Sequence, residues 1–177
     1  LMGGIPVYIA DAYTIIGDEF DGYRYKISSS HEKMFNEQFP QKRMNRISKL
    51  LIAARNGMAD SKLHRGEQAY FFGTEYAVCN SIHEFDLQSQ FHGPLSVNPQ
   101  HFPDTVLNAP TCHLSIENQM AGPVINISSG KNSSLDAIGL GFVAMRRGEY
   151  DEILVGGYDE LGEIQLLQRQ EGKPICE

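Results

Sequence analysis

The chain has 177 residues, which is long enough for one domain to bury its own hydrophobic core without a disulfide or metal staple. With 41% hydrophobic and 21% charged residues it has the composition of a globular protein, and its net charge of −7 disfavours binding to nucleic acid or anionic lipid. No apolar stretch is long enough to cross a bilayer, and the first residues lack the layout of a signal peptide. We therefore expect a cytoplasmic protein with one domain over residues 1–177 and no membrane contact.

The first half of the chain alternates between strand and helix patterns. A strand is predicted over Ile5–Ala10 from β-branched and aromatic residues, and an amphipathic helix over Gln41–Leu63, where apolar residues recur at intervals of three and four. The apolar run Ala69–Phe72 predicts a second strand that stops at the small pair Gly73-Thr74, and a helix over Glu75–Gln90 follows. Strand followed by helix is the unit of an α/β fold.

Prolines divide the middle of the chain, and clearer patterns return after Gly122-Pro123. The elements predicted from there are two short helices at Gln100–Leu107 and Ala109–Met120, strands at Val124–Ser128 and Glu152–Val155, a helix over Leu135–Met145 and an edge strand over Leu161–Leu167. Between the third strand and its helix, Gly130–Ser134 predicts a turn with helix-capping residues.

The helix over Leu135–Met145 is apolar around nearly its whole circumference, which is typical of a helix that is covered on all sides. In one sheet with helices on both faces, the outer side of such a helix needs a cover that this chain does not obviously supply. We therefore predict a surface for a partner chain or a second copy. The alternative is that Gly139, Gly141 and Ala144 let the chain's own loops pack closely over the helix.

The order of these motifs resembles the N-terminal half of a β-ketoacyl synthase, a condensing enzyme of fatty-acid and polyketide assembly in the thiolase-like superfamily. The motifs that carry the resemblance are Phe72-Gly73-Thr74, Gly122-Pro123 with the strand that follows, Gly130–Ile138, Arg147–Asp151 and Val155–Glu160. The resemblance implies an α/β fold, one thiolase-like half, with a mixed, mostly parallel sheet and helices on both faces. It also implies that the family's dimer contact uses the strand Val124–Ser128.

In this alignment the family's nucleophilic cysteine falls on Lys131, followed by Asn132, Ser133 and Ser134. A thiol at a helix N-terminus is suited to form a thioester because the helix dipole stabilises its thiolate, whereas an ammonium is placed against the same dipole. Only burial that leaves Lys131 a free amine would make it reactive. A shifted alignment would put Ser133 or Ser134 in this place, but nothing local could activate either, so both are interpreted as capping residues.

Other candidate groups carry weaker signals. The resemblance places the family's two catalytic histidines in a C-terminal half that this chain stops before. The histidines present match none of those positions and lack metal-site spacing, so they are interpreted as surface or loop residues: His31, His64, His83, His92, His101 and His113. Three cysteines without a C-x-x-C spacing predict reduced, buried thiols: Cys79, Cys112 and Cys176. The carboxylates Asp159, Glu160 and Glu163 are a paired-carboxylate candidate, and the competing interpretation is a solvated acidic strand.

These expectations combine into a hypothesis of a catalytically silent, ketosynthase-like accessory subunit in fatty-acid or type II polyketide biosynthesis, aryl-polyene-like clusters included. We expect no catalytic residue and no cofactor, and partnership as a homodimer or as a heterodimer with a ketosynthase. An alternative is an acyltransferase or decarboxylase that another chain completes, with Lys131 binding a carboxylate or phosphopantetheine group. A third is a module that binds an acyl chain or an acyl carrier protein, the latter through a basic helix face at Lys42, Arg43, Arg46 and Lys49.

Overall fold

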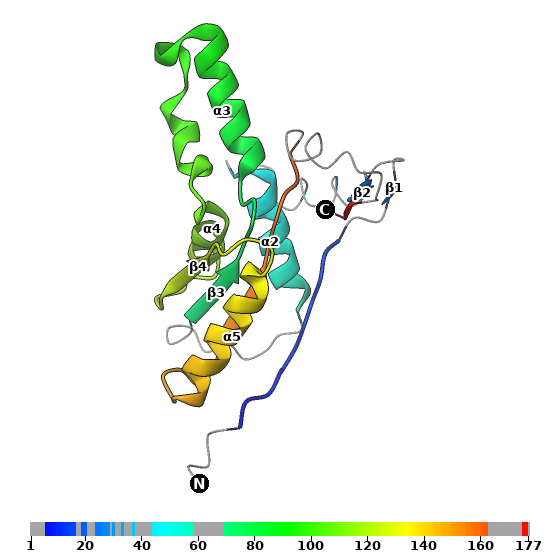
Figure 1. Cartoon of the computed structure of the whole chain (residues 1–177), viewed down its shortest axis with the longest axis vertical. Coiled ribbons are helices and arrows are strands. Elements are labelled where there is room, and N and C mark those ends of the chain that lie inside the picture. The colour runs from blue at the N-terminus through cyan, green and yellow to red at the C-terminus, as the bar shows by residue number, and fades with distance from the viewer. Residues whose placement is uncertain are drawn as a thin grey trace.

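The computed structural model describes residues 6–16, 19–20, 24–28, 30, 33, 37, 44–58, 69–162 and 175–176. Its elements are β1 (Glu19–Phe20), β2 (Arg24–Lys26), α2 (Arg46–Gly57), β3 (Ala69–Gly73), α3 (Cys79–His92), the 3₁₀ helices η1 (Pro94–Ser96) and η2 (Pro99–Thr105), α4 (Ala109–Glu117), β4 (Val124–Ile127), α5 (Ser133–Arg146), β5 (Ile153–Gly157) and β6 (Ile175–Cys176). Figure 1 shows them along the chain.

The centre of the fold is a parallel sheet with the strand order β4-β3-β5. Tyr70 in the middle strand stands opposite Val124 on one side and Leu154 on the other. All five residues of β3 are buried, as is usual for a parallel strand covered on both faces. In a second, small sheet β1 pairs antiparallel with β2, and β2 pairs parallel with β6. The predicted α/β class with a mixed, mostly parallel pairing is confirmed.

One face of the central sheet packs against α2 and α4. Because side chains alternate along a strand, Tyr70 and Phe72 point to this face and join Leu154 in one core with the buried residues of the two helices. The Asn45 side chain caps α2 by accepting a hydrogen bond from the backbone N–H of Ser48 at 3.0 Å. The helix ends where Met58 turns to extended backbone, so it is shorter than the predicted Gln41–Leu63. Residues 41–43 and 59–63 lie outside the described ranges.

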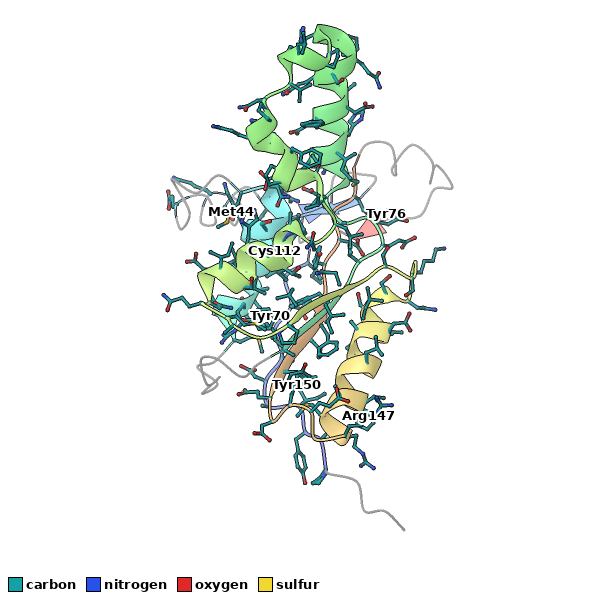
Figure 2. The ribbon with its side chains drawn as sticks, turned by 90° about the vertical axis from the view of Figure 1, so that its left-hand side faces the viewer. Met44, Tyr70, Tyr76, Cys112, Arg147 and Tyr150 are labelled. Atoms are coloured by element: carbon teal, nitrogen blue, oxygen red, sulfur yellow. The ribbon has the colours of Figure 1, made fainter. Side chains whose placement is uncertain are left out.

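The other face packs against α5 through small side chains. Ala137 and Ala144 are buried against Phe71, and a Cβ at Gly141 would come within 2.5 Å of the Val155 side chain. Phe71 also meets Tyr150 edge-on, with ring centroids 6.3 Å apart (Figure 2). Because the helix lies this close to the sheet, only alanine and glycine fit between them. Helices therefore cover both faces, as the sequence predicts.

The large apolar residues of α5 point away from the sheet. Leu135 is 68% exposed and Phe142 49%, and Ile138, Leu140 and Val143 are exposed with them. A Cβ added at Gly139, on the same side, would have no atom within 4 Å. The described part of the chain therefore leaves this face uncovered, and the alternative that its own loops pack over the helix is wrong. We call the five residues 135, 138, 140, 142 and 143 the outer face of α5.

The structure corrects three further predictions. Residues 6–10 form no strand; Tyr8 and Ile9 are exposed, and no strand among the described residues pairs with them. The helix predicted at 100–107 is the 3₁₀ helix η2 over 99–105, with Pro99 at its first position and Pro103 inside it. Leu161 and Gly162 lie outside any strand, and the rest of the predicted 161–167 strand falls outside the described residues.

The helix predicted from Glu75 begins later, at Cys79. The backbone N–H groups of residues 75–77 donate to the Asp159 carboxylate instead, and Ala77 adopts a positive φ of 51°. From Cys79 on, α3 projects away from the sheet with η1 and η2 beside it, as Figure 1 shows. It has no buried residue, and the rings of Phe85 and Phe102 join it to η2 at a centroid distance of 6.1 Å.

Two glycines of α5 offer a matched test of the close contact between helix and sheet. Gly139→Ala adds a methyl group in open space, so we expect it to stabilise the protein by up to about 1 kcal/mol through helix propensity. Gly141→Ala adds the same methyl against the Val155 and Ile153 side chains, and we expect it to be less stable than Gly139→Ala by about 1–3 kcal/mol. Urea unfolding of both variants gives this difference directly. Equal stabilities would mean that α5 does not lie against β5 as described.

Candidate functional site

The candidate site is the turn between β4 and α5, at the carboxyl edge of the central sheet. Because the strands are parallel, Gly73, Ile127 and Gly157 all lie at this edge, paired in register. Residues 128–132 carry the chain from β4 to the first turn of α5. Gly130 has a positive φ of 85°, a conformation that favours glycine, and its carbonyl accepts from the Ser133 N–H at 3.0 Å. The result is a sharp turn from strand to helix.

Glycines at the ends of the neighbouring strands let α5 begin directly on the sheet edge. A Cβ at Gly73 would lie 2.1 Å from the backbone carbonyl of Ser133, and one at Gly157 would lie 1.9 Å from the Ser134 hydroxyl oxygen. Neither separation is possible between real atoms, so any side chain at these two positions would move the helix. The glycines in the two predicted strand ends, Gly-Thr and Gly-Gly, are thus required because a side chain at either position would overlap the start of α5.

The structure separates the predicted site residues by exposure. Lys131 and Asn132 are exposed, so the burial that a free amine at Lys131 would need is not present. Ser133 is only 2% exposed; its hydroxyl donates to the Gly130 carbonyl at 2.5 Å and accepts from the Ser129 N–H at 2.9 Å. Ser134 is half-buried against Gly157.

The prediction that the two serines cap the helix is wrong. Asn132 is the N-cap residue, without a side-chain cap hydrogen bond, and Ser133 and Ser134 are the first two helical residues. The Ser133 hydroxyl instead closes the turn that precedes the helix. Since this oxygen is buried and makes two hydrogen bonds, it is not placed as a nucleophile either. The Ser129 hydroxyl donates to the carboxylate of Asp136 in the first turn of α5.

The turn itself contains no thiol in residues 128–134, all of which are described. Cys112 lies on α4, across the sheet from α5 (Figure 2), and accepts a weak hydrogen bond from the Asn108 side chain at 3.4 Å. Cys79 starts α3 and its thiol donates to the Glu160 carbonyl at 3.0 Å. Burial raises the pKa of the Cys79 thiol, which lowers the fraction of nucleophilic thiolate. Both cysteines are free and half-buried, and Cys176 lies in β6.

Asp159 and Glu160 do not form a solvated acidic strand. The Asp159 carboxylate accepts from the Thr74 hydroxyl at 2.7 Å and from the N–H groups of Glu75 and Tyr76 at 2.9 and 2.7 Å. Glu160 is only 4% exposed and pairs with Arg46 on α2 at 3.3 Å. The prediction failed because each partner lies more than 80 positions away in the sequence. Glu163 lies outside the described residues.

A buried hydrogen-bonded network below this edge was also missed from the sequence. The Tyr158 hydroxyl donates to the Leu107 carbonyl at 2.8 Å and lies 3.0 Å from the Asn126 side-chain oxygen. Asn126 also donates to the hydroxyl of Thr111, which is fully buried on α4. Burial raises the pKa of the Tyr158 phenol above its ordinary value, so it remains protonated and a donor at neutral pH. The network ties β4, β5 and α4 together.

The histidines are more varied than predicted. His113 is partly buried on α4 and lies 3.1 Å from the Asp104 carboxylate, so it is not a loop residue, whereas His92 and His101 are exposed. His31 and His64 lie outside the described ranges. Within those ranges no three metal-ligating side chains converge, and no helix has the length and apolarity that crossing a membrane requires.

The hydrogen bonds of Asp159 predict a measurable contribution to stability. Asp159→Ala removes the carboxylate acceptor of the Glu75 and Tyr76 N–H groups and of the Thr74 hydroxyl, while the Ala77 N–H keeps its hydrogen bond to the Thr74 hydroxyl, so we expect a loss of about 1–2 kcal/mol in the free energy of unfolding. Asp151→Ala is the matched control, because Asp151 is an exposed carboxylate before β5. Urea unfolding should show a change within about 0.5 kcal/mol for this control. Equal losses in the two variants would contradict the assigned role.

Comparison with known proteins identifies the family of this chain. The model of the β-ketoacyl synthase N-terminal domain matches residues 12–175, nearly the whole chain. Comparison with curated proteins gave no match.

Solved structures share the fold at low sequence identity. The ishigamide ketosynthase/chain length factor aligns with a TM-score of 0.69 and 21% identity over 80% of this chain and 45% of its own. A type II ketosynthase bound to a hexaketide, in the AntDE:AntF complex with its acyl-carrier protein, aligns with a TM-score of 0.62 and 17% identity over 73% of this chain and 35% of its own. The aligned part thus covers less than half of either of these chains.

A third structure, the ketosynthase ApeO in complex with its chain length factor ApeC from Xenorhabdus doucetiae, aligns with a TM-score of 0.52 and 12% identity. The alignment covers 82% of this chain, about 145 residues, and 66% of the other, which therefore has about 220 residues. A family model that matches nearly the whole chain, together with the shared fold, settles the affiliation. The chain belongs to the β-ketoacyl synthase family, as a form of its N-terminal domain.

Proposed function

We propose that this chain is a catalytically silent, ketosynthase-like subunit that acts by associating with a ketosynthase in fatty-acid or type II polyketide biosynthesis. The observation that carries the proposal is Lys131. It stands in the strand-to-helix turn where the motif alignment places the family's nucleophilic cysteine, and the turn holds no thiol in residues 128–134. A sharp turn from strand to helix without a thiol supports the proposal.

The chemistry of condensation explains why this substitution matters. A ketosynthase holds its acyl chain as a thioester, which requires a thiolate, and the positive end of the α5 dipole would stabilise one. The Lys131 ammonium carries the opposite charge and is exposed to solvent. The Ser133 hydroxyl makes hydrogen bonds within the turn, and Ser134 packs against Gly157 at the sheet edge. The residues of this turn therefore support binding or structure rather than acyl transfer.

The outer face of α5 supports the second half of the proposal, association. Its exposed residues form an apolar surface on the molecule, and such surfaces on folded proteins mark contacts with other chains. Two of the structurally similar proteins are described as a ketosynthase with its chain length factor.

We place an acyl carrier protein second among the partners. The similar AntDE structure holds one, but carrier proteins are acidic and this chain has a net charge of −7. Of the basic helix face that the sequence predicted, Arg46 pairs with Glu160, and Lys42 and Arg43 lie outside the described residues. A carrier protein would therefore reach the complex more readily through the ketosynthase.

Association can be tested by isolating the tagged chain from its native host and identifying what accompanies it. We expect one ketosynthase in a 1:1 ratio by native mass spectrometry. Leu135→Asp with Phe142→Asp should abolish its retention, because two charges would be buried in the contact. Ile116→Asp, on an exposed residue of α4, is the control and should retain the partner. Purification of a homodimer alone, or retention of the ketosynthase by the double variant, would contradict the proposal.

Silence can be tested in the same complex with acyl- and malonyl-carrier protein as substrates. We expect the chain alone to give no condensation product, and Lys131→Ala to leave the rate of the complex within about twofold of the wild type. A large loss of rate in Lys131→Ala would instead favour the alternative, in which Lys131 binds a carboxylate or phosphopantetheine group at a site completed by the partner. Product analysis by mass spectrometry distinguishes the two outcomes.

A further inference from the structure

A cavity of about 380 Å³ lies on the α2 side of the sheet, away from the β4–α5 turn. Its walls are α2, the end of β5 and the segment 13–15, which passes beside α2 in Figure 1. The volume lies at the lower end of the range for small-molecule sites. A cavity of this size against the hydrophobic core is large enough to hold a ligand.

The shape of the cavity follows one face of α2. The α2-side wall includes residues at helical spacing, among them Ile47, Leu51, Ala54, Arg55 and Met58. From the first to the last of these the helix rises about 16 Å, at 1.5 Å per residue. Across from them are buried apolar residues of the core, among them Phe72, Leu114 and Leu154. A largely apolar space that extends along three turns of helix suits an extended chain.

The charged residues around the cavity differ in whether another group pairs with them. At the end formed by the start of α2, Arg46 pairs with Glu160 at 3.3 Å. Asp159, which also lines this end, accepts hydrogen bonds from Thr74 and the backbone of residues 75–77. Toward the end of α2, Arg55 has no ion pair and no side-chain hydrogen bond with any described residue, and its buried Nε lacks a partner.

An arginine without a partner at the edge of an apolar cavity favours an anionic ligand. A buried polar atom without a hydrogen bond is costly, and a guanidinium is commonly satisfied by a carboxylate, which it can bind through two parallel N–H groups. The single unpaired cation sits near one end of the space, and the other lining is mainly apolar. The matching ligand has an apolar chain and one anionic head.

We propose that this cavity binds a medium-chain fatty carboxylate, with its carboxylate on Arg55 and its chain along α2 toward the end of β5. The site is separate from the β4–α5 turn and does not depend on the association proposed above. An uncharged chain of the same length fills the same space but leaves Arg55 without an acceptor.

The test is isothermal titration calorimetry of the whole chain with decanoate. Decanol serves as the uncharged ligand of the same length. We expect decanoate to bind at least about tenfold more tightly than decanol, because a hydrogen bond to a charged group is worth about that factor. Arg55→Gln should weaken the binding of decanoate by a similar factor and leave the affinity for decanol unchanged. Arg147→Gln, on a 71% exposed arginine beyond α5, is the matched control and should bind as the wild type does.

Two further variants keep the test decisive if Arg55→Gln fails to fold. Arg55→Lys retains the charge without the planar fork and should bind decanoate with intermediate affinity. Ala54→Phe places a ring in the cavity and should weaken both ligands. Circular dichroism checks the fold of each variant. No decanoate binding by the wild-type chain, equal binding of decanol, or undiminished decanoate binding by both Arg55 variants would overturn the proposal.

Discussion

The structure depends on how closely α5 approaches the sheet. At three places, Gly73, Gly157 and Gly141, a single added carbon would overlap atoms of the facing element, so the helix can lie where it does only because these side chains are absent. Two of the glycines end strands and the third lies in the helix. Together they bring the N-terminus of α5 onto the carboxyl edge of a parallel sheet, which is where α/β proteins commonly place their functional sites.

The same constraint divides α5 into two faces with different uses. Because only alanine and glycine fit against the sheet, the large apolar residues of the helix are turned outward, and the described part of the chain does not cover them. A globular domain rarely leaves such a face in water. The close packing that makes the turn possible thus also produces the surface on which the proposed association rests.

At the edge itself, the turn is held by groups other than the Lys131 side chain. The positive φ of Gly130 and the buried Ser133 hydroxyl shape the turn, and the Asp159 carboxylate caps residues 75–77 after β3. The network of Tyr158, Asn126 and Thr111 fixes the strands below it. A frame of this kind does not depend on the side chain at position 131, because none of its hydrogen bonds involves that side chain. An exposed lysine in such a frame is consistent with a structural or binding role.

The sequence by itself determined the three central strands, predicted at Ala69–Phe72, Val124–Ser128 and Glu152–Val155, to within two residues at each end, and it carried the family resemblance, because apolar periodicity and small strand-ending residues are local signals. It also indicated that α5 would need a cover. Only the tertiary structure decided the roles of Asp159 and Glu160, since their partners lie more than 80 positions away, and the failure of the strand predicted at Ile5–Ala10, since a strand needs a neighbour as well as a propensity. The cavity beside Arg55 also depends on the tertiary structure, because its walls come from segments far apart in the sequence, and only the folded structure shows that the buried Arg55 Nε lacks a partner among the described residues.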